Sequence, residues 1–394
     1  MPDTVQNSAP ETAANPVKKA RSREHELARP NPGAGWSMDL LDLENPTVIP
    51  PAETGFVQEA GILRADNSYC PRGALWRNHR PLTIEPQIPR RRHVRVLDGK
   101  WLWGGVLWMH FGHFLVESTS RLWGLDHMGD DVQGILFIPK RPKTGENVVS
   151  YQRDYVDLMG CDLPIKVLTK PTRVQQLIVP GQGFGLGRII AGTDPFRKSI
   201  HDRFGQMIHP DGPERLYISR SKLGFRKGSL IGEARLETYL ADHGYEIFHP
   251  EEHDLATQVA RYKAAKQVIA AEGSAIHLFA MVARPDQQTA IVVRRRSGAT
   301  DQIETHLQSF AGITPLTIDA LSRTWKPHGP AKKRMWLGEM DMPRLQDALF
   351  TGGFLGDSPQ NWHSLPDAEV MQMLGDGYEL VETTHSPQME KRSA

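Results

Sequence analysis

Between residues 215 and 279, short apolar runs alternate with segments in which apolar residues recur at helical spacing, and no other feature limits the fold as strongly. Leu216–Ile218, Tyr245–Phe248 and Val268–Ala271 have the length and character of buried strands. Each segment between them is long enough for a helix. Strands that alternate with helices indicate βαβ units, so this region predicts a Rossmann-like fold around a parallel sheet.

The ends of the predicted helices carry matching signals. Leu236 and Leu240 stand one helical turn apart, and Gly244 follows where that helix would stop. Asp254 can cap the next helix with its carboxylate. The run Thr289–Val293 is a further buried strand. The second half of the chain is therefore predicted to be an α/β domain.

The first half shows a similar alternation and is also predicted to be α/β. Val94–Leu97 and Trp101–Trp103 are expected to pair as a hairpin around the turn Asp98–Gly99. Further strands are expected at 135–138, 166–168 and 177–179, and helices at 111–125, 148–159 and 194–207.

Composition changes along the chain predict four parts, which are a disordered tail (1–35), an N-terminal α/β domain (36–208), a C-terminal Rossmann-like domain (209–325) and a C-terminal extension (326–394). The extension is expected to form helical pieces such as Met342–Leu349 without a core of its own. The segment His209–Pro213 suggests a hinge and a cleft between two domains. The glycine-rich segment Gly181–Gly187 is expected to be a mobile loop that borders this cleft.

Composition excludes several function classes. The formal net charge of +1 does not indicate a nucleic-acid-binding face. The two cysteines, Cys70 and Cys161, do not form a disulfide framework or a metal-ligand spacing. With a mean hydropathy of −0.44, no apolar run that could span a bilayer and no signal-peptide pattern, we expect a cytoplasmic protein, with peripheral attachment to the inner face of the membrane left open.

Two places in the second half are suited to phosphate. Arg220 follows a strand directly and can grip a diphosphate through its planar fork, and Arg226 is near enough in the sequence to share the charge. Gly273 and Ser274 open a helix, whose free N–H groups and dipole favour an anion, and His277 lies one turn further on. The alternatives are a solvated arginine at the end of a strand and a serine that only caps its helix.

One helical row in the first half is suited to proton transfer. His113 and Glu117 lie one turn apart, and Arg121 continues the same row. An imidazole can accept a proton near neutral pH, and a carboxylate beside it fixes its tautomer. The alternative is a surface ion-pair row. Zinc binding by His110 and His113 is a weaker alternative, because no third ligand stands at a suitable spacing.

Together these residues resemble glycosyltransferase family 61, which includes capsular-polysaccharide-type, O-linked N-acetylglucosamine and xylan-type transferases. The segment His113–Glu117, followed by Arg121–Trp123, is similar to the His-Phe-x-x-Glu helix of the family. The carboxyl-terminal signature of the family is similar to Tyr217–Arg220, Arg226, Glu233, Gln258 and Gly273–Ala275. The resemblance runs from about Val94 to Arg296, and it departs at Glu272, where many members have histidine.

The resemblance implies a GT-B fold, in which two Rossmann-like domains face a cleft, and inverting transfer of a hexose or pentose from a nucleotide-sugar to a hydroxyl of a glycan or glycoconjugate. Surface-polysaccharide synthesis is the expected setting. It implies His113 as the base with Glu117 as its partner, and a nucleotide-diphosphate site at Arg220, Arg226, Glu233, Gly273 and Ser274, to which its position one turn into the helix adds His277. Glu233 would face the nucleoside or brace an arginine.

No cofactor or metal is expected beyond the nucleotide-sugar, which is a co-substrate. Two further classes of function stay open from the sequence: a noncatalytic glycan-binding or scaffold protein with the same fold, and a nucleotide-sugar epimerase.

Overall fold

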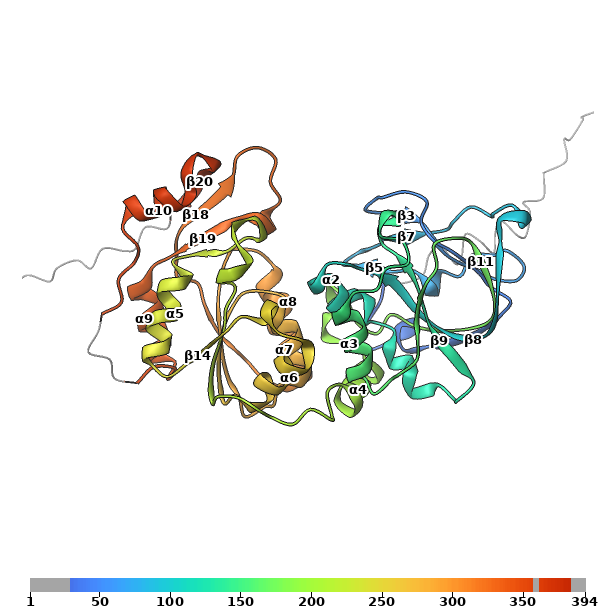
Figure 1. The fold of residues 1–394 in the computed structure, drawn as a ribbon, viewed down its shortest axis with the longest axis horizontal. Coiled ribbons are helices and arrows are strands. Elements are labelled where there is room, and N and C mark those ends of the chain that lie inside the picture. The colour runs from blue at the N-terminus through green and yellow to red at the C-terminus, as the bar shows by residue number, and fades with distance from the viewer. Residues whose placement is uncertain (1–28, 357–360, 384–394) are drawn as a thin grey trace, which may run out of the picture.

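The structure is a computed structural model that describes residues 29–356 and 361–383. Most of the predicted disordered tail, residues 1–28, lies outside the described residues. Figure 1 shows two lobes side by side, which we call the first lobe (residues 29–208) and the second lobe (residues 209–383). The prediction of a mixed α/β chain is confirmed, whereas the GT-B arrangement stays a prediction.

A mixed sheet forms the centre of the first lobe. Its order is β10 (Ile165–Val167), β9 (Val132–Pro139), β8 (Arg95–Leu107), β11 (Thr172–Pro180), β2 (Thr47–Ile49) and β4 (Gly61–Leu63), and β1 (Leu40–Glu44) also pairs with β11. The strands from β10 to β11 run parallel, and β1, β2 and β4 are antiparallel. Two small ladders pair β3 (Gln58–Glu59) with β7 (Thr83–Ile84) and β5 (Trp76–Arg77) with β6 (Arg80–Pro81).

The predicted hairpin around Asp98–Gly99 is wrong. Both segments belong to the single strand β8, which is 13 residues long. Gly99 has a φ of 85°, and the register of β8 against β11 shifts between Leu97 and Lys100, where β8 has one residue more than β11. The Asp-Gly pair therefore marks a β-bulge within a strand, because a left-handed glycine serves a bulge as well as a turn.

The helix predicted over residues 111–125 is broken into three pieces. A short α2 (Phe111–His113) continues as one π-helical turn, η4 (Phe114–Ser118), and a 3₁₀ segment, η5 (Leu122–His127), follows. The backbone N–H of Thr119 donates to the carbonyl of Phe114, five residues back. Single π turns of this kind are frequent at functional sites.

Because the helix is broken, Arg121 leaves the predicted polar row. Its side chain is buried and donates to the carbonyl oxygens of Pro180 and Ala74, so it ties the helix to the sheet. The other helices of the first lobe are α3 (Ser150–Leu158) and α4 (Asp194–Arg203), both close to the predicted positions.

The second lobe contains the predicted parallel sheet, in the order β14 (Glu246–Phe248), β12 (Arg215–Ile218), β15 (Gln267–Ala271), β16 (Gln288–Val292) and β17 (Leu316–Ile318). The helices between these strands are α5 (Glu233–Asp242), α6 (Leu255–Ala264), α7 (Ala275–Val282) and α8 (Ala299–Ala311). Asp254 caps α6 as predicted, since its Oδ1 accepts the N–H of Thr257 at 2.8 Å.

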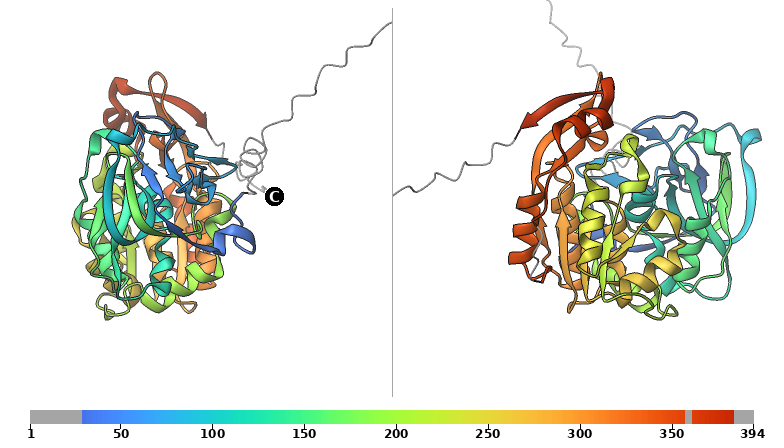
Figure 2. Two further views of the ribbon diagram at one scale, coloured as in Figure 1. Left: turned by 90° about the vertical axis from the view of Figure 1, so that its right-hand side faces the viewer. Right: turned by 60° about the vertical axis from the view of Figure 1, so that its left-hand side comes forward.

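The C-terminal elements pack onto the second lobe. Strand β18 (Leu321–Pro327) crosses the expected boundary at residue 325 and pairs with β19 (Leu337–Met340) and β20 (Tyr378–Thr383), while β13 (Leu230–Ile231) completes the sheet. Helix α9 (Met342–Thr351) shares a core cluster with the parallel sheet, and α10 (Asp367–Leu374) follows. Figure 2 shows these orange and red elements on the outer side of the second lobe.

Short 3₁₀ turns link these elements: η1 (Gly35–Met38), η2 (Pro71–Gly73), η3 (Arg91–His93), η6 (Pro142–Thr144), η7 (Arg188–Ala191), η8 (Ser221–Leu223), η9 (Phe225–Lys227), η10 (Pro250–Glu252), η11 (Lys333–Met335) and η12 (Gly375–Gly377).

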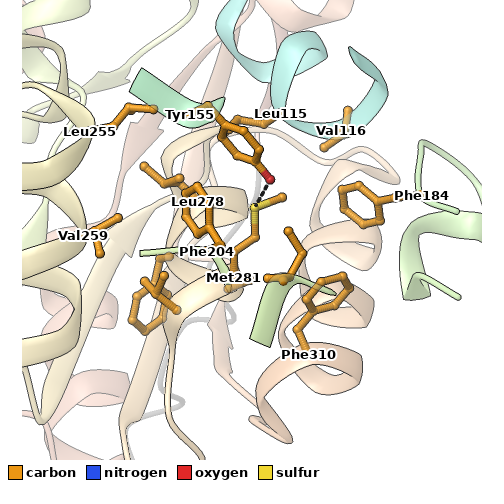
Figure 3. Close-up of a cluster of buried hydrophobic side chains, with 14 of the residues drawn as sticks. Leu115, Val116, Tyr155, Phe184, Phe204, Leu255, Val259, Leu278, Met281 and Phe310 are labelled. Carbon is orange, nitrogen blue, oxygen red and sulfur yellow. Dashed lines mark hydrogen bonds between the residues drawn. The ribbon is translucent and has the colours of Figure 1, made fainter. Parts of the chain in front are cut away.

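One apolar cluster belongs to both lobes. Leu115 and Tyr155 of the first lobe pack with Leu278 and Met281 of α7 in the second (Figure 3). The hydroxyl of Tyr155 donates to the sulfur of Met281 at 3.4 Å. Helices α3 and α4 contact α6 and α7, respectively. This continuous core fixes how the two lobes meet.

The glycine-rich segment Gly181–Gly187 is part of this packing, so the prediction of a mobile loop is wrong. Phe184 is fully buried and stacks on Phe196. The side chain of Gln182 bonds both the N–H and the carbonyl of Trp76. The glycines here allow close packing of the chain against its neighbours.

Candidate active site

His113 and Glu117 contact each other where α2 passes into the π turn. Nδ1 of His113 lies 3.3 Å from Oε2 of Glu117, as the one-turn spacing predicts. The Glu117 side chain has no exposed surface, whereas that of His113 is 29% exposed. The imidazole is thus the accessible partner, and the carboxylate lies behind it.

Arg77 completes this pair, and sequence reasoning did not find it. Its Nε and Nη2 donate to the two oxygens of Glu117 at 2.5 and 2.6 Å, and Nη2 also lies 3.1 Å from Nδ1 of His113. Burial alone would raise the pKa of Glu117, but the hydrogen bonds from His113 and Arg77 and the charge of Arg77 outweigh it and lower the pKa below its ordinary value. The carboxylate is therefore ionised.

Trp108 and Lys140 extend the cluster at the ends of two neighbouring strands. Trp108 follows β8, and its ring lies 4.6 Å from the ring of His113. Lys140 follows β9 directly, is 4% exposed, and donates to Oε1 of Gln58 and to the carbonyl of Phe56, both at 2.7 Å. Burial, followed by the charge of Arg77, lowers the pKa of Lys140 to about 8. The rule that singled out Arg220, a charged residue straight after a buried strand, would also have found Lys140.

In the second lobe, Arg220 and Gly273 lie at the same edge of the parallel sheet, as predicted. Ile218 of β12 pairs with Ala270 of β15, and Arg220 and Gly273 lie two and three residues beyond these positions. A Cβ atom placed on Gly273 would lie 2.5 Å from Nη1 of Arg220, so only glycine leaves room for the guanidinium. Nε of Arg220 is buried and has no hydrogen-bond partner among the described residues.

Glu233 braces the arginine from behind. Its Oε1 accepts from the backbone N–H of Arg220 at 2.8 Å and from the hydroxyl of Tyr217 at 3.0 Å. Its Oε2 has no partner within the described part of the chain. Burial raises the pKa of Glu233 to about 7. Of the two expectations for this residue, the contact with the Arg220 backbone matches bracing.

Glu272, Arg294 and Arg295 form a second charged group beside the turn, which sequence reasoning missed. Oε1 of Glu272 accepts from Nε of Arg295 at 3.2 Å, and its Oε2 accepts from the backbone N–H of Arg294 at 3.3 Å. Burial, followed by the charges of Arg220 and Arg295, lowers the pKa of Arg294 to about 9. Glu272, the departure from the family pattern, thus binds arginines of this lobe.

The remaining predicted residues lie in different surroundings. Arg226 is exposed on η9 and lies near enough to Tyr378 of β20 for its charge to act on that hydroxyl. His277 is buried in α7, with its Nδ1 3.0 Å from Nδ1 of His306. Burial lowers the pKa of His277 to about 4, so it is neutral at neutral pH.

The two parts of the candidate site meet at one close contact between the lobes. A Cβ atom placed on Gly112 of α2 would lie 2.9 Å from Cβ of Ser274, so the His113 helix touches the Gly-Ser turn. Ser274 makes no capping hydrogen bond with its side chain, which argues against the alternative that it only caps α7. The charge of His113 also acts on His277.

The family comparison agrees with this assembly. Residues 111–292 match the model of the family described as Glycosyltransferase 61. This match supports the assignment of the chain to glycosyltransferase family 61. The match confirms the resemblance seen in the sequence and implies a glycosyltransferase, with a sugar donor and an acceptor. No curated protein matches the chain.

Two features are absent from the described residues. No helix there is long and apolar enough to cross a bilayer. Likewise, residues 29–356 and 361–383 contain no group of three or more His, Cys, Asp or Glu side chains placed to hold a metal ion. His110 and His113 therefore have no third ligand of these types there, so the zinc alternative gains no support. Whether catalysis uses a metal stays a prediction.

Proposed function

We propose that this family member is an inverting glycosyltransferase that moves a hexose or pentose from a nucleotide-sugar to a hydroxyl of a glycan or glycoconjugate. The observation that carries the proposal is the contact between Gly112 and Ser274. It brings a histidine–carboxylate pair on one lobe next to an arginine and a helix start on the other. Inversion needs both a base for the acceptor and a stabiliser for the departing diphosphate.

His113 acts as the base in this proposal. With a proton on Nδ1 donated to Glu117, the lone pair on Nε2 accepts the proton of the acceptor hydroxyl. The acceptor oxygen then bonds to the anomeric carbon as the bond from that carbon to the diphosphate breaks. Arg77 keeps Glu117 ionised, so the carboxylate holds this tautomer without taking the proton itself.

Arg220 and the start of α7 receive the charge of the leaving diphosphate. The unpartnered Nε of Arg220 and the room left by Gly273 support this role. In the proposal the two lobes act as the GT-B pair of domains, the enzyme needs no metal, and it works in surface-polysaccharide synthesis in the cytoplasm or at the inner face of the membrane.

Incubation with a panel of UDP-sugars, followed by mass spectrometry, tests the function. We expect slow hydrolysis of at least one donor without an acceptor, and transfer once a suitable glycan is added. An isomerised nucleotide-sugar would instead indicate an epimerase. A protein that binds UDP-sugars but neither hydrolyses, transfers nor isomerises the sugar would indicate a noncatalytic protein.

A further inference from the structure

Cations and aromatic rings alternate along the edge of the first-lobe site. Cζ of Arg80 lies 4.5 Å from the centre of the Phe56 ring, and Cζ of Arg77 lies 5.5 Å from the same ring. Cζ of Arg77 also lies 5.0 Å from the Trp108 ring, which Nζ of Lys140 approaches to 5.5 Å. We call these five residues the cation–aromatic row.

The row carries more positive than negative charge. Of its three cations, only Arg77 has a carboxylate partner in the described part of the chain, which is Glu117. Among the described residues, Arg80 and Lys140 form no ion pair, and the hydrogen bonds of Lys140 go to uncharged oxygens. The aromatic faces offset part of the repulsion among the cations. An anion from outside would stabilise the row further.

The end of the cation–aromatic row at Arg80 and Phe56 is accessible to solvent. Arg80 is exposed, and Phe56 is 47% exposed, whereas Lys140 is almost fully buried. A ligand would therefore contact Arg80 and the edge of the Phe56 ring directly. Lys140 would attract an anionic ligand electrostatically without touching it. The lowered pKa of Lys140, about 8, still leaves it mostly protonated at neutral pH.

The row also shares a residue with the candidate base. Arg77, its middle member, lies 3.1 Å from His113 through Nη2. In the proposed reaction, the molecule next to His113 on this lobe is the acceptor, because the base acts on the acceptor hydroxyl. The arginine of the donor clamp lies on the other lobe.

We propose that the cation–aromatic row is a binding site for an anionic acceptor, that is, a glycan with a carboxylate or phosphate group on a sugar near the hydroxyl that is glycosylated. Only the assignment to the acceptor rests on the proposed function. Binding of an anionic sugar by this lobe does not.

Calorimetry with matched glycosides tests the proposal without any donor. p-Nitrophenyl β-D-glucuronide and p-nitrophenyl β-D-glucoside 6-phosphate are compared with neutral p-nitrophenyl β-D-glucoside. We expect at least one anionic glycoside to bind about three- to tenfold more tightly than the neutral one, as suits a charge-assisted contact at an exposed site. The glucuronide and phosphate arms show which anion is preferred.

Arg80→Gln should abolish this preference, and Phe56→Leu should reduce it. Arg91→Gln is the matched control, because it removes the same charge near the start of β8, roughly 40 Å along the strand from Trp108 at about 3.3 Å per residue. The control should keep the preference. Both Arg80 and Arg91 are exposed, so neither change threatens folding.

Three results would overturn the inference. The anionic and neutral glycosides could bind equally, or the preference could survive Arg80→Gln. UDP could also displace the glucuronide and itself bind more weakly to Arg80→Gln, which would assign the row to the donor. A protein without transferase activity that still shows the Arg80-dependent preference would contradict the proposed function and leave the anion site intact.

Discussion

Two buried glutamates, one in each lobe, differ in how their carboxylates are satisfied. Glu117 has both oxygens bound by Arg77, and its pKa is lowered. Glu233 has one oxygen bound by three donors and the other without a partner in the described residues, and burial raises its pKa to about 7. The Glu117 carboxylate is thus fully bonded, whereas the second-lobe part of the site keeps polar atoms without a partner among the described residues.

This difference fits two separate tasks. A base needs a fixed partner, so a fully bonded carboxylate keeps His113 in one orientation before substrate arrives. A diphosphate clamp needs donors that the protein has not already used, such as Nε of Arg220. Loss of a first-lobe residue should therefore affect turnover or folding, and loss of a second-lobe residue should affect donor binding.

The largest effect is expected from His113→Ala. Removal of a general base should lower kcat by roughly 10²–10⁴-fold while UDP binding stays near normal. Glu117→Gln should have a related effect, and the double variant should lose far less than the product of the two. Turnover and Tm must be measured on the same preparations. A folded His113→Ala variant with near-normal turnover would contradict the role of His113 as the base.

Arg77→Gln should mainly affect folding. Without Arg77, a buried ionised Glu117 keeps only His113 as a partner, and such a loss costs about 3–5 kcal/mol. Denaturant unfolding measures this loss of stability. Adding Glu117→Gln to the Arg77→Gln variant should restore much of the stability, because the buried charge is then removed. Arg80→Gln, opposite Arg77 in the small β5–β6 ladder, is the control and should change stability by less than about 0.5 kcal/mol. Equal losses of unfolding free energy in Arg77→Gln and Arg80→Gln would mean that the ion pair with Glu117 does not account for the stabilisation by Arg77.

Glu233 should make stability depend on pH in the opposite sense to a salt-bridged carboxylate. Its pKa in the folded state is raised to about 7 from an ordinary 4.5, so between these values the folded protein holds a proton that the unfolded chain releases. Stability is therefore greatest at the acid end of this window and falls as the pH rises through it, by up to about 3 kcal/mol.

Glu233→Gln mimics the protonated form and isolates this term. The unfolding free energy of the unaltered protein minus that of the variant should fall between pH 5 and 7.5, since other titrating groups contribute equally to both. A difference that stays flat over this range would show that Glu233 does not carry a raised pKa.

The sequence placed Arg220 and Gly273 of the second lobe together and missed Arg77 of the first lobe, for a physical reason. In a parallel sheet, the carboxyl ends of neighbouring strands lie at the same edge. Residues that follow these strands therefore lie close together, whatever the conformation of the segment that connects them. Arg220 and Gly273 could be placed in this way. Arg77 stands 40 positions before Glu117, with the long strand β8 between them, and no periodicity relates the two residues.

Local sequence patterns gave wrong predictions where the same residues suit two different local conformations. Asp98–Gly99 suits a hairpin turn and also a bulge within β8. The apolar pattern of residues 111–125 suits one α-helix, but Arg121 is drawn into the core to bind two carbonyl groups, which the spacing alone does not reveal. The contact between His113 and Glu117 was still predicted correctly, because both residues precede the end of the π turn at Ser118.

Arg220→Ala should weaken UDP binding by about 1.5–3 kcal/mol, the range for a hydrogen bond to a charged group. Arg220→Lys should recover only part of this, because an ammonium group cannot make the planar two-point contact. Titration calorimetry gives both values, with turnover measured at saturating donor as a second readout. Unchanged UDP affinity in Arg220→Ala would reject the diphosphate site, whatever the effect on His113 variants.

The smallest effect tests the geometry of that site and is expected from Gly273→Ala. The added methyl group would come within 2.5 Å of Nη1 of Arg220, so the guanidinium must move while the backbone can stay. We expect UDP affinity to fall about three- to tenfold, or roughly 0.7–1.4 kcal/mol, with little change in Tm. Gly377→Ala is the control, because a methyl group there meets nothing within 4 Å. Since the effect acts through Arg220, Gly273→Ala should cost nothing further in an Arg220→Ala background. The same loss in both backgrounds would mean that the methyl group blocks the ligand itself, and the role of glycine would then be to admit the diphosphate rather than the arginine.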